Sequence, residues 1–318
     1  MKTEIMVSVH VLAYNHEKTI ARALNSILSQ KTQYKYEIVI GEDASTDRTA
    51  DIVRGFANKY PDIIVPLIRE KNLGAQKNAI DTLRHCQGNY IAFCEGDDYW
   101  LVDDKLEKQV SFLETHEEYS SCTTKCLYYH NGIEEAYPFS TEDCESLSDM
   151  LNRGNVKRYA TCTNVVRNIY RYKPELLKYF SSSIVGDIIS ETISITNGKI
   201  HYIDYVTAVY DRVSKRGEET SFSSLSLERQ ITEIRKAIET CKIISGKKYY
   251  SDWEKYEASF NRGLFWELCK IQGRRAAWKQ VRKQINLKKE FYLLSLLLKD
   301  YFTYKGFFHN EKDCLDIL

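Results

Sequence analysis

Short apolar runs alternate with amphipathic segments over the first hundred residues of the chain. Four runs of apolar, largely β-branched residues have the length and composition of buried strands, and they cover 5–12, 36–41, 63–68 and 89–95. Between them, apolar residues recur at helical spacing at 20–28, 52–60 and 79–83. We expect Asn15 to cap the first of these helices. Repeated strand–helix units predict a mainly parallel sheet with helices on both faces.

The pattern changes twice along the rest of the chain. Residues 120–215 are mixed, and short strands are expected at 122–129, 199–204 and 206–209. A helix is expected around Asp187. Beyond Leu225 the apolar residues follow helical spacing almost without interruption. We therefore divide the chain into a sheet-containing domain of residues 1–222 and a helical region of residues 223–318.

Polar segments follow the predicted strands directly. In a mainly parallel sheet with helices on both faces, ligands bind at the carboxyl ends of the strands. That rule selects the segments 13–15, 42–45, 72–78 and 95–98 as the candidate ligand site.

The composition is that of a globular protein without a strong overall charge. The chain has 318 residues, of which 43% are apolar and 28% charged, and its net charge is +1. This balance argues against a nucleic-acid binder, which usually carries a basic surface. No segment reaches the roughly 20 apolar residues of a membrane-spanning helix, and residues 1–4 lack the pattern of a signal peptide. Nine scattered cysteines without a Cys-x-x-Cys pair fit a reducing compartment, so we expect a cytoplasmic protein.

The near-zero net charge conceals two unlike parts. Residues 1–224 contain 26 basic and 32 acidic residues, so their net charge is −6. Residues 225–318 contain 19 basic and 12 acidic residues, so their net charge is +7. Within residues 274–289, seven of sixteen are Lys or Arg and none is acidic, and an apolar segment follows at 291–302. Residues 274–302 therefore either make peripheral contact with an anionic membrane, at the inner face of the cell membrane, or pack on the protein with their charges in solvent.

Three carboxylates follow the fourth predicted strand, in the sequence Glu95-Gly96-Asp97-Asp98. Carboxylates this close repel one another and are costly to bury without a counter-charge. A divalent cation such as Mg²⁺ or Mn²⁺, which prefers oxygen ligands, would relieve the repulsion and bridge to substrate phosphates. The alternative is a solvated turn before the helix at 104–116.

Further polar groups follow the second and third strands. Asp43 would lie beside the end of the first strand, where its carboxylate can accept hydrogen bonds from a nucleobase or a ribose. Asp47 is better explained as a charge at a helix start. Asn72 and Lys77 add an amide and a cation on the same edge, although a lysine at a helix start is commonly only solvated.

Several ordered motifs resemble a known family. They read VSVHVLAYN (7–15), NSILSQ (25–30), EIVIGEDASTDRT (37–49), NLGAQKNAI (72–80) and GNYIAFCEGDDYW (88–100). This order is similar to that of inverting family 2 glycosyltransferases, in particular a bacterial subset with an EGDDYW motif, and a weaker similarity continues at 186–187 and 198–212. The resemblance implies the GT-A fold, a Rossmann-like and mainly parallel mixed sheet, and transfer of a sugar from a nucleoside diphosphate donor.

The resemblance also implies a role for individual residues. Those expected to hold the nucleotide sugar are Ala13, Tyr14, Asn15, Asp43, Asn72, Lys77, Glu95, Gly96 and Asp98. Within this set, Asp43 would bind the base. Glu95 and Asp97 take the places of the family's Asp-x-Asp motif, with Asp97 as the principal ligand of Mn²⁺ or Mg²⁺.

Asp187 aligns with the family's general base, and inversion needs such a base on the face opposite the leaving nucleotide. Two departures from the family pattern matter. Glu95 replaces the usual Asp, which favours a water-mediated contact to the metal. The segment after Tyr210 carries Lys215 and Arg216 where many relatives have a histidine; these cations would meet the diphosphate or be ordinary loop charges. The alternative is that Asp187 only caps its helix.

The sequence therefore predicts a metal-dependent inverting glycosyltransferase that acts on a saccharide or lipid-linked acceptor in surface polysaccharide synthesis, with a UDP-sugar favoured as donor. A sugar nucleotidyltransferase is an alternative, although its Gly-rich loop is missing because residues 9–17 contain no glycine. A dinucleotide dehydrogenase and a P-loop NTPase lack their motifs. The remaining alternative is a degenerate GT-A domain that only binds a saccharide or a partner protein.

Overall fold

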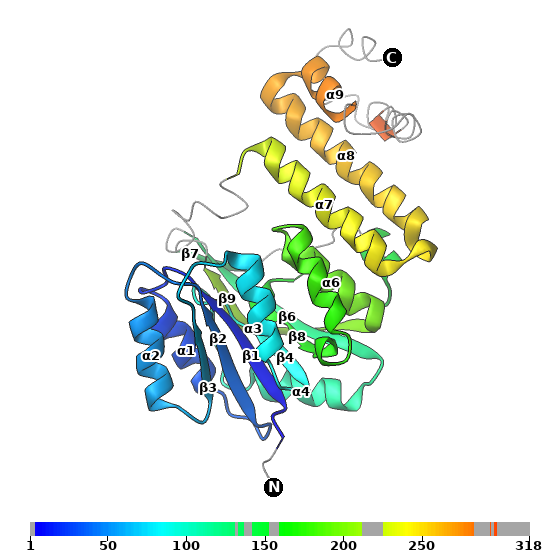
Figure 1. Cartoon of the computed structure of the whole chain (residues 1–318). Helices are drawn as coiled ribbons and strands as arrows, with labels where there is room; N and C mark the ends of the chain where they lie inside the picture. Colours follow the sequence, from blue (N-terminus) through cyan, green and yellow to red (C-terminus); the bar gives the residue numbers. More distant parts are fainter. Residues whose placement is uncertain are drawn as a thin grey trace. The chain divides into compact units, whose positions relative to one another are not determined.

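Nine strands form one mixed sheet in the computed structural model of the chain, which describes residues 4–130, 133–136, 142–152, 159–211, 225–282, 293, 296 and 297. The strands are β1 (Val7–Ala13), β2 (Tyr36–Glu42), β3 (Ile64–Ile68), β4 (Tyr90–Phe93), β5 (Tyr99–Trp100), β6 (Tyr119–His130), β7 (Ile133–Ala136), β8 (Val165–Arg167) and β9 (Lys199–Asp211). Their order is β3-β2-β1-β4-β8-β6-β9-β5, with β7 paired to β6 (Figure 1).

Both parallel and antiparallel pairs occur in this sheet. Strands β3, β2, β1 and β4 run parallel to one another, and so do β6 and β9. Strand β8 is antiparallel to both of its neighbours, and β5 is antiparallel to β9. The predicted mixed, mainly parallel sheet is confirmed, and its four parallel strands come from the first hundred residues.

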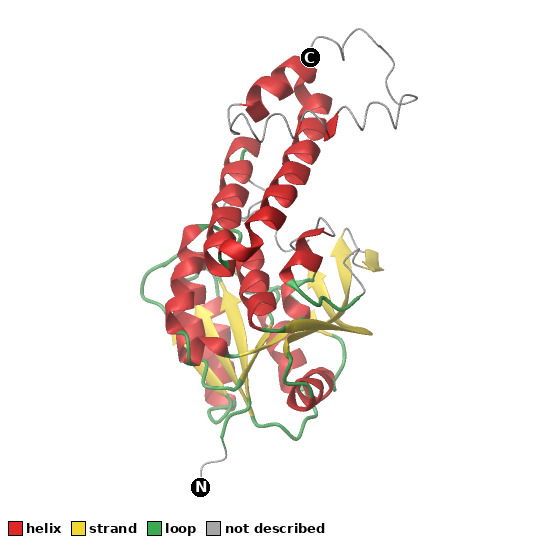
Figure 2. Cartoon of the chain, turned by 90° about the vertical axis from the view of Figure 1, so that its right-hand side faces the viewer, coloured by secondary structure: helices red, strands yellow, loops and turns green. Residues whose placement is uncertain are grey.

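Helices cover both faces of the sheet, with α1 and α2 on one face and α3 on the other (Figure 1), and Figure 2 marks the helices in red. The helices of the described residues are α1 (Ile20–Leu28), α2 (Thr49–Lys59), α3 (Ala75–His85), α4 (Lys105–Thr115), α5 (Leu147–Asn152), α6 (Gly186–Asn197), α7 (Leu227–Ser245), α8 (Tyr250–Gln272) and α9 (Arg274–Arg282). Short 3-10 helices occupy Thr161–Thr163, Ile169–Arg171, Pro174–Ser182 and Lys247–Tyr249.

Alternation along β1 explains the two layers. Val7, Val9 and Val11 are fully buried in one core with apolar residues of α1, α2 and α4. Burial of each such side chain is worth about 2 kcal/mol relative to exposure. Successive side chains of a strand point to opposite faces, and His10 lies on the other face, where its ring contacts α3 through the Ala79 carbonyl. This second face, which is less apolar, is the one on which α3 packs.

Two local predictions are wrong. The strands expected at 199–204 and 206–209 are one strand, β9, because irregular register with β6 around Lys125 absorbs the break in the apolar pattern. Asn15 does not cap α1, whose N-cap is Thr19 without a capping side chain. Instead Asn15 has a positive φ of 55°, and its side-chain oxygen accepts a hydrogen bond from the Thr46 N–H at 2.9 Å.

Contacts group the chain into two units, Met1–Leu147 with Val156–Gly246, and Ser148–Asn155 with Lys247–Leu318. The first unit contains the sheet and also α7, whose Cys241 thiol lies 3.7 Å from the Ile188 carbonyl of α6. The second contains α8 and α9. The predicted domain boundary near residue 222 falls in 212–224, outside the described residues, and stays a prediction. Within the described part of the chain, no helix combines the length and apolar character needed to cross a membrane.

Candidate active site

The carboxyl ends of three parallel strands meet at one edge of the sheet. Ala13, the last residue of β1, pairs with Glu42 at the end of β2, and the Asp43 N–H donates to the Ala13 carbonyl at 3.0 Å. On the other side of β1, the Gly96 N–H donates to the Leu12 carbonyl at 2.9 Å. The predicted segments 13–15, 42–45 and 95–98 are therefore neighbours in space.

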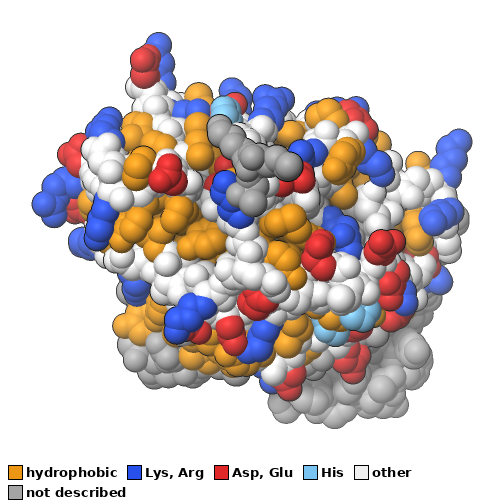
Figure 3. Space-filling view, turned by 90° about the horizontal axis from the view of Figure 1, so that it is seen from below, with side chains coloured by type: hydrophobic (Ala, Val, Ile, Leu, Met, Phe, Trp, Pro, Cys, Tyr) orange, Lys and Arg blue, Asp and Glu red, His pale blue; other side chains and the backbone are white. Residues whose placement is uncertain are grey.

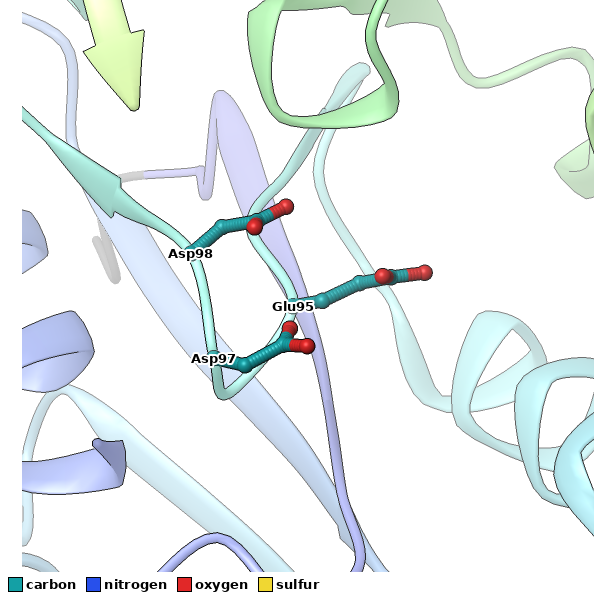
Figure 4. A group of neighbouring side chains, drawn as sticks. All are labelled: Glu95, Asp97 and Asp98. Carbon is teal, nitrogen blue, oxygen red and sulfur yellow. The ribbon is translucent and has the colours of Figure 1, made fainter. Parts of the chain in front are cut away.

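An acidic cluster follows β4 at this edge. Glu95, Asp97 and Asp98 each offer one carboxylate oxygen within 4.8 Å of the others. Figure 4 shows that all three side chains point to the same side of the loop. Asp97 and Asp98 are buried, and Glu95 is half-buried. Because the donors are all carboxylate oxygens, the cluster fits Mg²⁺ or Mn²⁺.

Gly96 lets the acidic loop lie against β1. A Cβ at this position would lie 2.6 Å from Nδ1 of His16 and 3.0 Å from the Leu12 carbonyl oxygen. Any larger residue would therefore push the loop away from the strand. The turn is closed by a hydrogen bond from the Asp98 N–H to the Glu95 carbonyl at 3.0 Å.

Asp43 organises the turn that leads into α3. Its two carboxylate oxygens accept hydrogen bonds from the N–H groups of Leu73 at 2.7 Å and Gly74 at 3.0 Å, and Asn72 Nδ2 donates to its carbonyl at 3.0 Å. Gly74 has φ 82°, a conformation that favours glycine. Asp43 and Asn72 are thus brought together, and Lys77 lies exposed in the first turn of α3. Their contacts to a nucleotide stay predictions.

The loop after β1 is fastened to the loop after β2. The Asn15 N–H donates to Ser45 Oγ at 3.0 Å, in addition to the contact with Thr46. Asp47 accepts hydrogen bonds from the Thr49 N–H and hydroxyl at the start of α2, which agrees with its interpretation as a helix-start charge. Tyr14 lies half-buried between these contacts and the strand. The loop after β1 and the loop after β2 are therefore held together by hydrogen bonds and form one continuous surface.

A cavity of about 160 Å³ lies between Glu95 of the acidic cluster and Asp187, the predicted general base. Its walls include Glu95 on the loop after β4 and Asp187 in the first turn of α6. Thr161 Oγ1 lies 3.3 Å from Asp187 Oδ1 and donates to it. Helix α6 has Val185 as its N-cap and no side-chain capping bond, so Asp187 does not cap it. Lys215 and Arg216 lie outside the described residues.

His10 is a cavity residue that lies outside the segments selected from the sequence. Its ring lines the cavity and lies 5.5 Å edge-on from the Phe93 ring, and Nε2 lies 3.3 Å from the Ala79 carbonyl. Burial lowers the pKa of His10 to about 4, against the opposing effects of the hydrogen bond to Ala79 and the charge of Glu95. The signal in the sequence was a titratable side chain within a largely apolar strand.

The depressed pKa of His10 predicts a specific loss of stability in acid. Between its ordinary pKa of 6.5 and about 4, the unfolded chain binds a proton that the folded chain does not, so the free energy of unfolding falls as the pH falls. We expect this site to contribute a loss of about 2 kcal/mol between pH 7 and pH 4.5. His10→Gln should lack that part of the loss when urea unfolding is measured at both pH values. If the free energy of unfolding fell equally with pH in both proteins, His10 would not be the source of the loss.

Comparison with known proteins gives a family match. Residues 8–173 match the family model described as glycosyl transferase family 2. An uncharacterized protein of Mycobacterium bovis is 32% identical over 213 residues, which cover 65% of this chain and 58% of the relative. The Escherichia coli UDP-Glc:α-D-GlcNAc-diphosphoundecaprenol β-1,3-glucosyltransferase WfaP is 38% identical over 119 residues, 36% of this chain and 44% of the relative. The matches thus span about half the length of these curated relatives.

Two solved structures share the fold. S. aureus TarS in complex with UDP-GlcNAc superposes with a TM-score of 0.61 at 20% identity, over 91% of this chain and 79% of that one. The mannosyltransferase PcManGT from Pyrobaculum calidifontis, in complex with GDP-Man and Mn²⁺, gives a TM-score of 0.56 at 19% identity, over 96% and 84%. These likenesses concern the fold, and they confirm the expected GT-A architecture. With the family model matched across residues 8–173 of 318, the chain belongs to glycosyl transferase family 2.

Proposed function

We propose that this chain transfers a sugar, with inversion, from a nucleoside diphosphate donor to a hydroxyl of a saccharide or lipid-linked acceptor. The observation that carries the proposal is the cavity lined by both Glu95 and Asp187. Inversion requires a base on the face of the sugar opposite the leaving group. A cavity that contacts the acidic cluster and a carboxylate of another element is suited to hold the sugar between them.

Asp187 is the proposed general base. The acceptor hydroxyl gives its proton to the Asp187 carboxylate as its oxygen attacks the anomeric carbon, and the bond from that carbon to the diphosphate oxygen breaks. The hydrogen bond from Thr161 to Oδ1 helps to orient the carboxylate toward the cavity that both residues line. Attack from the side opposite the diphosphate inverts the configuration of the anomeric carbon.

Asp97 and Glu95 are the proposed ligands of Mn²⁺ or Mg²⁺, with Asp98 beside them. A divalent ion, when bound, stabilises the negative charge of the departing diphosphate. The close approach of three carboxylate oxygens supports the site, since such a cluster is strained without a cation. Glu95 also lines the cavity, so it is the member of the cluster nearest to the proposed sugar site.

The nucleotide is proposed to lie on the two fastened loops at the sheet edge. Its contacts would come from the residues predicted from the sequence, namely Ala13, Tyr14, Asn15, Asp43, Asn72, Lys77, Gly96 and Asp98. UDP is the favoured nucleotide, because WfaP is named for UDP-Glc and TarS was solved with UDP-GlcNAc. Membership of the subset with the EGDDYW motif stays a prediction.

The lining of the cavity suits a small molecule. Its volume is about 160 Å³. Leu12, Ala79 and Phe93 give part of the wall an apolar surface, while Glu95 and Asp187 supply charged groups. Such a mixture of apolar walls and few polar groups is typical of small-molecule sites.

A screen of nucleotide sugars tests the proposed function. The full chain with Mn²⁺ should slowly hydrolyse one nucleotide sugar and release the nucleoside diphosphate, and hydrolysis should stop on addition of a chelator. Binding of UDP or GDP without any turnover or transfer would instead support the degenerate domain. Release of pyrophosphate from a nucleoside triphosphate and a sugar 1-phosphate would support the nucleotidyltransferase.

We further propose that the chain contacts the inner face of the cell membrane through residues 274–302. On α9, Arg275, Lys279 and Arg282 are exposed at helical spacing, whereas Ala277 and Val281 are buried. The described part of this segment therefore offers charge to an anionic surface, while its apolar face is packed. On the face in Figure 3, by contrast, basic and acidic side chains are interspersed without an extended patch of one sign.

Reversing the charge of Arg275, Lys279 and Arg282 to Glu should weaken binding to anionic vesicles. Each Lys or Arg near such a surface contributes about 1 kcal/mol, so the triple variant should lose most of its binding at low salt. Flotation with phosphatidylserine vesicles measures the effect, and vesicles of phosphatidylcholine alone are the control. Unchanged flotation of the variant would show that α9 does not carry the contact.

A further inference from the structure

Arg22 of α1 lies against the acidic loop and makes three contacts there. Its Nη2 donates to the Asp97 carbonyl oxygen at 3.0 Å and to Asp211 Oδ2 at 2.7 Å. Its guanidinium carbon lies 4.1 Å from the centre of the Tyr99 ring. One side chain thus joins α1, the loop after β4 and the end of β9.

The end of β9 also contacts the acidic loop directly. The Asp211 N–H donates to Asp98 Oδ1 at 3.0 Å, and β5 pairs with β9 through Tyr99 and Val209. Asp97 is held by Arg22 directly, and Asp98 is held through the residue whose carboxylate Arg22 binds. Arg22 is therefore linked to both buried aspartates of the cluster, directly to Asp97 and through Asp211 to Asp98.

In this arrangement of the described residues, Arg22 does not pair with a carboxylate of the cluster. Arg22 contacts Asp97 through the backbone carbonyl, and its positive charge is paired with Asp211. A planar guanidinium can bond both acceptors and still stack on Tyr99, which the ammonium group of a lysine cannot do. The arginine therefore fixes the loop without competing with a metal ion for the Asp97 carboxylate.

We propose that Arg22 is a positioning residue that holds the loop of Asp97 and Asp98 in the conformation that binds a divalent cation. This inference rests on the metal site of the proposed function. Residues that orient metal ligands typically change metal affinity by about 10- to 100-fold when replaced. The Arg22 side chain is 40% exposed, but that of Asp211 is only 5% exposed. Arg22→Ala therefore also removes a cation from beside a buried carboxylate and should lower thermal stability, so metal affinity is measured where each variant is folded.

The test measures Mn²⁺ binding to the full chain in saturating UDP, by calorimetry and by the electron paramagnetic resonance signal of free Mn²⁺. Arg22→Ala should raise the dissociation constant for Mn²⁺ about tenfold or more, with Arg22→Lys intermediate. Arg54→Ala is the matched control, because Arg54 on α2 pairs only with its neighbour Asp51 among the contacts described. Its dissociation constant should equal that of the unsubstituted chain.

A double-mutant cycle separates positioning from a general loss of structure. Asp211→Asn keeps the N–H that binds Asp98 but weakens the pair with Arg22, so adding it to Arg22→Ala should cost less than its effect alone. Unchanged Mn²⁺ affinity in both Arg22 variants would overturn the inference and leave the metal site standing. Failure of the unsubstituted chain to bind Mn²⁺ would overturn the proposed metal site and the inference together.

Discussion

Asp187→Asn is expected to lower the turnover number for sugar transfer by about 10³-fold, within the range of 10²- to 10⁴-fold that a general base contributes. Asparagine has nearly the same shape but cannot accept the proton of the acceptor hydroxyl. Its side-chain oxygen can still accept the hydrogen bond from Thr161. Initial rates at saturating donor and acceptor, measured by release of the nucleoside diphosphate, report the loss.

The same variant should keep its fold and its affinity for the nucleotide. Asp187 lies in the first turn of α6, outside the loops at the sheet edge that are proposed to hold the nucleotide. Asp62→Asn makes the same chemical change at an exposed turn and serves as the control. Full activity of the Asp187 variant would refute its role as base, whereas loss of UDP binding would place the defect in donor binding.

Asp97→Asn is expected to reduce transfer as severely, for a different reason. Loss of one carboxylate weakens a cation that contributes several kcal/mol of charge stabilisation, so the turnover number should fall about 10³-fold. The affinity for Mn²⁺ in the presence of UDP should fall as well. Calorimetric titration of Mn²⁺ into the chain with UDP measures that second effect.

Comparison of the two variants separates the two roles. Asp187→Asn should retain Mn²⁺ binding and lose turnover, whereas Asp97→Asn should lose both. Because Asp97 is buried beside Asp98, removal of its charge also relieves repulsion in the free protein, and thermal stability should not fall. Normal Mn²⁺ affinity in the Asp97 variant would remove it from the ligand set and leave Glu95 and Asp98 as the candidates.

Local sequence pattern was sufficient for the first hundred residues. Apolar runs and helical spacing identified β1, α1, β2, α2, β3, α3 and β4, because each of these elements buries a continuous face. Strands β5 and β8 are only two and three residues long and carry no pattern of their own. They exist because neighbouring strands of the sheet offer them hydrogen-bonding partners.

For two site residues, Asn15 and His10, the local sequence likewise did not predict the contacts. Asn15 has the side chain of a helix cap, yet it binds Thr46 because the loops after β1 and β2 lie side by side. His10 is one residue in an apolar strand, and only the packing of α3 makes it part of a cavity. In both cases the side-chain chemistry was evident from the sequence, but its partner was not.

The sequence by itself determined that carboxylates follow β2 and β4, that the strands are parallel there, and that their ends share one edge. These properties follow from local periodicity and from the geometry of parallel sheets. Only the tertiary structure brought Asp187 to the cavity of Glu95, and only it joined Arg22 to Asp211, 189 residues away. Such contacts depend on the strand order β4-β8-β6-β9-β5 and on the packing of α6, which arise from long-range burial and leave no periodic signal in the chain.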